Sequence, residues 1–307
     1  MKIYLNSAKE NWIVDRVKKE WIIFNKNITT NYLFNSEIIW IIAPWAWKKI
    51  NKKQLQNKLV VCSIYHIDEE KFDEIQLLEF QQRDKYVDKY HVISKKTEQQ
   101  IKNLTDKPIF IKPFWINQNI FYQLENKELI RNKYNIDSSN FVIGSFQRDT
   151  EGSDLISPKL SKGPDRLVQV IEHFVKNESN ITVLLAGKRR NFIINELEMR
   201  DINYKYFEMV DFSTLNELYN CLDLYVVSSR YEGGPQAILE CAISKTPIIS
   251  TDVGVAPEIL ATESIFTMDS ISLAKPNIDE AYYNAQKFTI PNGLEDYRKF
   301  FKELYEN

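Results

Sequence analysis

The sequence predicts an α/β fold with two doubly wound domains, each built on a parallel sheet. Short apolar runs rich in isoleucine and valine alternate with amphipathic helical segments along the chain, and this alternation is typical of parallel sheets. Two compositional differences divide the chain, because all eight glycines lie at or after Gly144 and all six tryptophans lie at or before Trp115. The length of 307 residues and the hydrophobic content of 44% are sufficient for two ordinary domains.

The first domain is predicted to span residues 1–115. Its expected elements alternate, with strands at 2–5, 37–43, 58–65, 89–93 and 109–111 and helices at 11–24, at 73–84 and from about residue 97. The strand segments are short and almost entirely apolar, as strands buried on both faces are. The segment 114–140 is expected to connect this domain to the second one.

The second domain is predicted to span residues 116–289. Its expected strands lie at 141–145, 181–186, 222–227 and 247–251, and its expected helices lie at 167–175, 215–221 and 236–243. A terminal helix is expected at 294–305, where apolar residues recur at helical spacing.

Composition excludes several classes of protein. The net charge of −2 gives no reason to expect nucleic-acid binding, and no apolar run reaches the roughly 20 residues that span a bilayer. Residues 1–5 are expected to form a strand and not a signal peptide. Cys62, Cys221 and Cys241 lie in apolar runs, which favours three reduced core thiols in a cytoplasmic protein. Neither cysteine nor histidine occurs at the spacing of a zinc site, so no metal is expected.

Residues 228–260 are the most informative part of the chain. A buried strand ends at Val227, a loop follows, and a helix is expected to begin at Pro235, since proline fits the first turn of a helix. Ligands of open α/β sheets bind outside the carboxyl ends of the strands. Gly233 and Gly234 allow the backbone to approach a ligand closely, and the helix start at Pro235 and Gln236 suits a diphosphate.

Two carboxylates in this segment are candidates for binding hydroxyl groups. Glu232 precedes the helix and is expected to hold the hydroxyls of a sugar, whereas Glu240 lies in the helix and is expected to hold those of a ribose. The alternative is an ordinary turn with two glutamates spaced by chance. The joint occurrence of both carboxylates, the glycines and the helix start at one strand-to-helix junction favours the functional interpretation.

The segment resembles the signature of the retaining glycosyltransferases of family 4. These proteins have the GT-B fold, in which two Rossmann-like domains face each other across a cleft. The family carries two glutamates separated by seven residues, as Glu232 and Glu240 are, and a later Gly-Gly-x-Pro-Glu segment that corresponds to 254–258 here, with Val255 at the second glycine. The resemblance covers about residues 110–265 and is thin before them. It implies that a helix at about 290–307 crosses back to the first domain.

The resemblance also implies which basic residues contact the leaving diphosphate. The family places an arginine and a lysine in the loop after the first strand of the second domain, and Lys162 matches the lysine. Arg148 is the candidate arginine, although it lies four residues past Gly144, and Lys159 is a rival of Lys162. The alternative is a solvated basic loop. The run Lys188–Arg190 is expected to be exposed charge.

In the first domain, the resemblance points to His66. The family often has a histidine at this strand end, where it faces the donor sugar across the cleft, whereas His91 and His173 are expected to be structural. The glycine-rich loop that commonly follows the family's first strand corresponds here to residues 6–9, which contain no glycine. Residues 43–53 interleave tryptophan with lysine, a composition that suits an anionic membrane surface or a sugar ring. The alternative is packed tryptophans beside solvated lysines.

The resemblance therefore implies a metal-independent, retaining enzyme without a cofactor. It would bind a nucleoside diphosphate sugar mostly in the second domain and the acceptor in the first, and it would transfer the sugar to a hydroxyl of a glycan or lipid-linked glycan. Peripheral contact to the inner membrane face is one option. Two alternatives stay open. One is a non-catalytic sugar-nucleotide-binding protein of this fold, and the other is a GT-B epimerase or phosphorylase.

Overall fold

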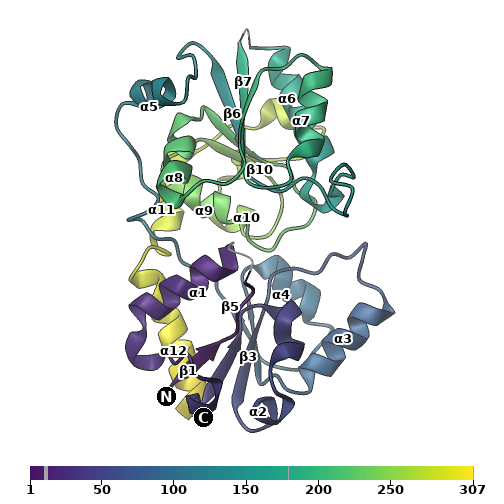
Figure 1. Cartoon of the computed structure of the whole chain (residues 1–307), viewed down its shortest axis with the longest axis vertical. Coiled ribbons are helices and arrows are strands. Elements are labelled where there is room, and N and C mark those ends of the chain that lie inside the picture. The colour runs from purple at the N-terminus through teal and green to yellow at the C-terminus, as the bar shows by residue number, and fades with distance from the viewer. Residues whose placement is uncertain (10–12, 179, 307) are drawn as a thin grey trace. The chain divides into compact units, whose positions relative to one another are not determined.

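The computed structural model describes residues 1–9, 13–178 and 180–306. The chain forms two compact units, shown in Figure 1. Unit 1 comprises Met1–Trp115 together with Phe288–Asn307, and unit 2 comprises Ile116–Lys287. Each unit is an α/β structure with one parallel sheet, which confirms the predicted fold class.

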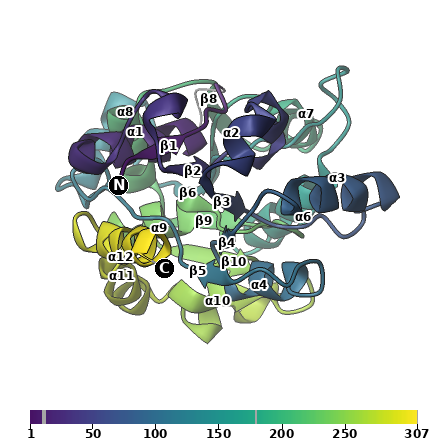
Figure 2. The ribbon, with the colours of Figure 1, turned by 90° about the horizontal axis from the view of Figure 1, so that it is seen from below.

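Unit 1 contains a five-stranded parallel sheet in which the strands follow one another in chain order, as Figure 2 shows. Its strands are β1 (Ile3–Leu5), β2 (Ile38–Ile41), β3 (Leu59–Ile64), β4 (Lys89–Val92) and β5 (Ile109–Ile111). Its helices are α1 (Ile13–Phe24), α2 (Lys52–Gln56), α3 (Glu74–Asp84), α4 (Lys95–Ile101) and α12 (Asn292–Glu306). All five predicted strands are present. The start of the helix expected at 11–24 falls partly outside the described residues.

Helix α12 belongs to unit 1 although it follows unit 2 in the sequence. It buries Tyr297 and Phe301 against one face of the sheet, where both rings contact Trp21 and Trp40. The opposite face is covered by a second apolar cluster that includes Phe80 of α3. Large aromatic side chains bury a great deal of apolar area, so α12 is an integral part of the core of unit 1.

Unit 2 contains a six-stranded parallel sheet in the order β11-β10-β9-β6-β7-β8. Its strands are β6 (Phe141–Ser145), β7 (Ile181–Ala186), β8 (Tyr204–Phe207), β9 (Leu224–Val227), β10 (Ile248–Thr251) and β11 (Ile265–Phe266). Its helices are α5 (Lys127–Lys133), α6 (Pro164–Val175), α7 (Asn191–Met199), α8 (Phe212–Cys221), α9 (Gln236–Ile243), α10 (Ala256–Ile259) and α11 (Ile278–Gln286). The order reverses between β6 and β9, and such a switch point is where ligands bind in open sheets.

Several of these elements were not predicted from the sequence. Strands β8 and β11 lie at the two edges of the sheet, and all four residues of β8 are only half-buried. An edge strand lacks the continuous apolar run of a central strand. Helix α5 lies in the segment 114–140, which had been expected only to connect the domains. Helix α8 begins three residues before the predicted start because Asp211 caps it, accepting a hydrogen bond from Thr214 N at 2.7 Å.

His91 on β4 is structural, as predicted, and it joins the sheet to α12. Its Nε2 lies 2.8 Å from the carbonyl oxygen of Lys112 and 3.0 Å from the hydroxyl of Tyr297, while its Nδ1 lies 2.9 Å from the hydroxyl of Ser63. A carbonyl oxygen only accepts, so Nε2 carries the proton and Nδ1 accepts from Ser63. Burial lowers the pKa of His91 from its ordinary 6.5 to about 4.

Replacing His91 by glutamine is expected to change how stability depends on pH. Because the folded protein holds the pKa of His91 at about 4, its neutral imidazole contributes stability above pH 6.5. That contribution is lost as the pH falls from about 6.5 to about 4, and it amounts to about 3 kcal/mol. Urea unfolding of both proteins at about pH 7 and pH 4.5 measures the difference. An equal pH dependence of the two free energies of unfolding would contradict this assignment.

Candidate functional site

The candidate site lies at the carboxyl edge of the sheet in unit 2, where β6 and β9 are neighbours. Three loops meet there, one after β6 (146–163), one after β9 (228–235) and one after β10 (252–255). Eight of the nine predicted site residues lie in these loops or in α9. The ninth, His66, lies in unit 1.

Lys162 and Glu232 form an ion pair, although 69 residues separate them in the sequence. Lys162 precedes α6, Glu232 follows β9, and both side chains are largely buried. The amide of Gln147 donates to the carbonyl oxygen of Lys162 at 2.9 Å, and its Oε1 accepts from Ser229 at 3.3 Å. The loops after β6 and β9 are therefore linked by side chains, and the two residues expected to bind the phosphate and the sugar lie in direct contact.

Glu240 is buried in the second turn of α9, and its carboxylate accepts a hydrogen bond from Tyr219 of α8 at 2.6 Å. Burial, and then the charge of Glu240, raise the pKa of Tyr219 well above its ordinary value, so the hydroxyl keeps its proton and donates. Tyr219 fixes the orientation of the carboxylate. The sequence does not indicate Tyr219 as a site residue, because nothing in its spacing from Glu240 marks a contact between two separate helices.

The helix start differs from the prediction by one residue. Pro235 is the residue before α9 and has ψ of 112°, so Gln236 is the first helical residue. The placement of Pro235 in the first turn was wrong, because its extended ψ directs the chain out of the preceding loop. Gly233 is buried, whereas Gly234, Pro235 and Gln236 are half-buried at the same edge.

Two glycines bring the three loops into backbone contact. A Cβ atom on Gly163 would lie 1.9 Å from the carbonyl oxygen of Ser228, and one on Gly254 would lie 2.1 Å from that of Gly233. Both glycines also have positive φ, at +60° and +49°. Val255, which occupies the position of the family's second glycine, has φ of −80° and is buried. No glycine is required there.

Basic residues gather beside Glu232. Arg148 is exposed, and its Nε donates to the carbonyl oxygen of Thr150 at 2.9 Å. The pKa of Lys159 is lowered by burial and by the positive charges of Lys162 and Arg148, with Glu232 acting in the opposite direction. Lys159, Lys162 and Arg148 therefore form one cluster of positive charge, which a bound anion would stabilise.

Arg190 is not exposed, contrary to the prediction for the run 188–190. It is 1% exposed, and its Nε lies 3.1 Å from Oδ2 of Asp149. Its Nη1 donates to the carbonyl oxygen of Gln147. Burial raises the pKa of Asp149 to about 6 against the opposing effect of Arg190. Lys188 is exposed as expected. The prediction for Arg190 failed because a run of charges after a strand looks solvated, whereas its countercharge lies 41 residues away.

The pair Arg190–Asp149 holds the loop that carries Arg148, and it is testable by Asp149→Asn. This change leaves a buried guanidinium without a countercharge, so we expect the free energy of unfolding to fall by about 3–5 kcal/mol. Urea denaturation measures the loss. The matched control is Asp201→Asn at an exposed position with φ of 55°, which asparagine also tolerates. Equal stability of both variants would contradict a supporting role for the pair.

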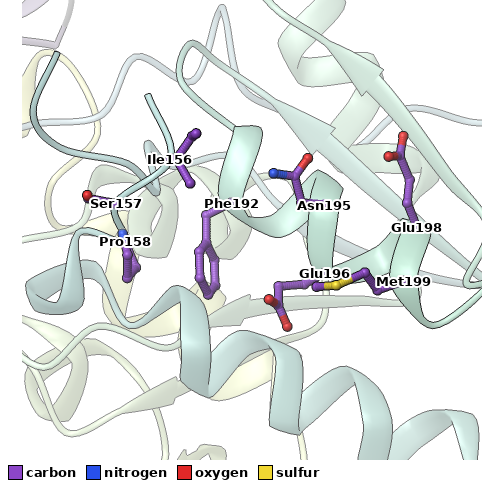
Figure 3. A pocket seen from close by; sticks show the side chains of 8 residues that line it. All are labelled: Ile156, Ser157, Pro158, Phe192, Asn195, Glu196, Glu198 and Met199. Atoms are coloured by element: carbon purple, nitrogen blue, oxygen red, sulfur yellow. The ribbon is translucent and has the colours of Figure 1, made fainter. Parts of the chain in front are cut away.

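His66 lies two residues after the end of β3 in unit 1, where it is half-buried. It lines a pocket of about 410 Å³ together with residues of α3 and of the segment after β2. The glycine-free loop after β1 is closed by Asn6, whose side chain exchanges two hydrogen bonds of 2.9 Å with the backbone of Ala43. A larger pocket of about 650 Å³ lies in unit 2 between residues 156–158 and α7, and none of the predicted site residues lines it (Figure 3).

The family model described as glycosyl transferases group 1 matches residues 126–282, which is just over half of the chain. The chain belongs to this family. The matched region includes all three loops of the site, so the glycosyltransferase family and the geometry indicate the same part of unit 2.

Solved structures of GT-B proteins are similar to this glycosyltransferase-family chain over almost its whole length. Anabaena HepE, solved in complex with UDP, has a TM-score of 0.76 at 12% identity, over 99% of this chain and 100% of that one. HepE was also solved with UDP-glucose. Sucrose-phosphate synthase from Thermosynechococcus elongatus has a TM-score of 0.71 at 14% identity, over 98% and 81%. At identities this low, the structural likeness establishes the fold of this chain, which is GT-B.

Among curated proteins, none matches the sequence. In the described residues, every helix is too short or too polar to cross a bilayer.

Proposed function

We propose that this protein is a retaining glycosyltransferase that moves a sugar from a nucleoside diphosphate sugar to a hydroxyl of a glycan or lipid-linked glycan. The observation that carries the proposal is the contact between Lys162 and Glu232 at the switch point of the sheet in unit 2. A lysine suits a diphosphate and a carboxylate suits the hydroxyls of a sugar, and the two residues lie beside the start of α9. The family membership and the UDP-glucose complex of a protein with the same fold support it.

In this proposal, the positive cluster stabilises the departing diphosphate. Lys162, Arg148 and Lys159 supply the charge, and the start of α9 supplies backbone N–H groups. Lys162 exchanges its ion pair with Glu232 for one with a phosphate oxygen, which frees the carboxylate to accept hydrogen bonds from sugar hydroxyls. Glu240, oriented by Tyr219, holds the ribose. His66 contacts the donor sugar. The acceptor hydroxyl attacks the anomeric carbon on the face from which the diphosphate leaves, the bond between that carbon and the diphosphate oxygen breaks, and the departing diphosphate takes the proton of the hydroxyl.

No metal is required in this scheme, because protein cations perform the neutralisation that a divalent ion performs in other transferases. Charge stabilisation and positioning are sufficient for large rate enhancements when the groups are held in place before reaction. Here the ion pair between Lys162 and Glu232 and the contacts between the loops hold the charged side chains in place before the donor binds.

A thermal-shift screen against UDP-, GDP-, ADP- and dTDP-sugars, each measured with and without EDTA, tests the donor assignment. A ligand that binds only the folded protein raises the unfolding midpoint in step with its affinity. We expect one nucleotide sugar to stabilise the protein clearly, and the same shift with and without EDTA. No shift with any nucleotide would contradict a nucleotide-sugar donor and would favour a phosphorylase, which needs none.

The stereochemistry requires a separate measurement. Once the donor is known, the anomeric configuration of the freshly formed product can be read by NMR. We expect it to equal that of the donor sugar, and inversion would contradict a retaining mechanism.

A further inference from the structure

The pocket of about 410 Å³ in unit 1 contains features that the proposed donor chemistry does not explain. It lies at the carboxyl end of β3, between the segment 44–49 after β2, the residues after β3, and α3. Aromatic and polar side chains share its wall, notably Trp45, Tyr65, His66, Asp68, Gln76 and Arg83. All of these residues belong to unit 1.

Arg83 is the unusual member of this wall. It is only 8% exposed. Among the described residues, none forms a hydrogen bond with its Nε and no carboxylate lies within ion-pair distance of its guanidinium. The guanidinium carbon lies 5.2 Å from the ring centre of Phe80, and the nearby Cys62 is a neutral thiol because burial raises its pKa to about 11.

Two neighbouring carboxylates, those of Glu79 and Asp84, already have partners. Glu79 pairs with Lys48 at 3.1 Å and accepts from the indole of Trp47 at 3.3 Å. Asp84 accepts from the hydroxyls of Tyr90 and Thr105, at 3.0 and 2.6 Å. A buried donor without a hydrogen-bond partner, as the Nε of Arg83 is, is costly, and an anion that enters the pocket and binds the guanidinium would relieve this cost.

Two further features describe the rest of the ligand. The Oδ1 atom of Asp68 is buried and accepts no hydrogen bond from a described residue, so it can accept one from a ligand hydroxyl. Trp45 is 50% exposed and its ring lies against Tyr65 at 6.1 Å, so it offers an apolar face to a flat or ring-shaped group. An arginine, a free carboxylate oxygen and an aromatic face together suit a hydroxylated ring that bears an anionic group.

We propose that this pocket binds the acceptor, and that the acceptor is a sugar or a similar polyhydroxylated ring carrying a phosphate or a carboxylate, which the guanidinium of Arg83 binds. The guanidinium donates two parallel hydrogen bonds to the anion, a geometry that suits a phosphate and a carboxylate equally. Asp68 accepts from a ring hydroxyl, and Trp45 covers one face of the ring. That the ligand of this pocket is the acceptor rests on the proposed function, whereas the preference for an anionic ring rests on the pocket alone.

Calorimetric titration of the full chain with glucose 6-phosphate, glucuronate and glucose tests the preference. Charge-assisted hydrogen bonds that glucose cannot make predict at least about tenfold tighter binding of one anionic probe. Tighter binding of glucose 6-phosphate alone identifies a phosphate, and tighter binding of glucuronate alone identifies a carboxylate. Equal behaviour of all three probes, including no binding by any of them, would overturn the proposal.

Variants at Arg83 separate a binding role from a structural one. Arg83→Gln is expected to abolish the difference between anionic and neutral probes, and Arg83→Lys to retain part of it. Because Arg83→Gln removes an unpaired buried charge, its unfolding midpoint is expected to equal or exceed that of the wild type. If Arg83→Gln instead had a lowered midpoint and kept the wild-type discrimination between anionic and neutral probes, the guanidinium would be structural and the proposal would be overturned. The control Arg298→Gln changes an arginine of α12 that pairs with Glu295, and it should leave probe binding unchanged.

The donor screen keeps the two proposals apart. Arg83→Gln is expected to retain the full thermal shift with the nucleotide sugar, and loss of that shift would assign the pocket to the donor and overturn the acceptor role. If no nucleotide sugar binds the wild type but the preference for an anionic probe depends on Arg83, the proposed function fails and the anionic-ring site stands.

Discussion

Replacing Glu232 by alanine is expected to abolish sugar transfer while the protein remains folded. In the proposed reaction the Glu232 carboxylate positions the donor sugar, and hydrogen bonds at a reacting sugar contribute several kcal/mol at the transition state. We therefore expect kcat/KM to fall at least about 1,000-fold. The folded protein loses one ion pair with Lys162, which remains partly accessible to water, so the loss of stability should stay within about 1–2 kcal/mol.

Two matched variants decide how this result is interpreted. Glu128→Ala removes an exposed glutamate of α5 in the same unit and should leave kcat/KM unchanged. Lys162→Met removes the other partner of the ion pair and should weaken binding of the nucleoside diphosphate itself. Near-normal turnover of Glu232→Ala would show that the carboxylate does not act on the sugar, and the assignment of the site would then be wrong.

Gly254→Ala is expected to disturb the site through the backbone. A methyl group at this position would lie 2.1 Å from the carbonyl oxygen of Gly233 and 2.7 Å from that of Glu232. Neither carbonyl is the end of a flexible side chain, so the loop after β9 has to move. The positive φ adds about 1–2 kcal/mol of strain, and the overlap adds a similar amount. Together they should lower the free energy of unfolding by about 2–4 kcal/mol.

The same movement displaces Glu232, so transfer activity is expected to fall even at temperatures where the variant is fully folded. Gly152→Ala is the matched control. Its φ of +73° imposes the same kind of backbone strain, but a Cβ there meets only the side chain of Asp154 at 3.4 Å. It should lose about 1 kcal/mol and keep its activity. If Gly254→Ala behaved like Gly152→Ala, the close approach of the two loops would have no functional importance.

The elements predicted correctly share a simple local signal. The apolar strands of both units and the helix that carries Glu240 are marked by runs and periodicities within a few residues of one another. Strands β8 and β11 were missed because edge strands are only partly buried, and α8 was predicted short because its cap, Asp211, lies outside the apolar period. The position of Pro235 shows the same limit, since its φ fits both the first turn and the residue before it.

The contacts within the site show a different limit. Lys162 with Glu232, Tyr219 with Glu240 and Arg190 with Asp149 each join residues far apart in the chain. The resemblance supplied the first pair as separate candidates and did not place them in contact. It gave no indication of Tyr219, and the charge pattern gave the wrong environment for Arg190. These partners depend on which strands are neighbours in the sheet.

The sequence by itself determined that the protein is α/β, that parallel strands alternate with helices in both halves, and that the chemistry gathers after the strand ending at Val227. These features follow from local patterns, because burial on both faces requires apolar runs and a helix start requires particular residues. Only the tertiary structure decided that β6 lies beside β9, that Glu232 meets Lys162, and that Arg83 is buried beside a pocket without a countercharge. Strand order and the environment of a charge arise from contacts between distant segments, and no local period encodes them.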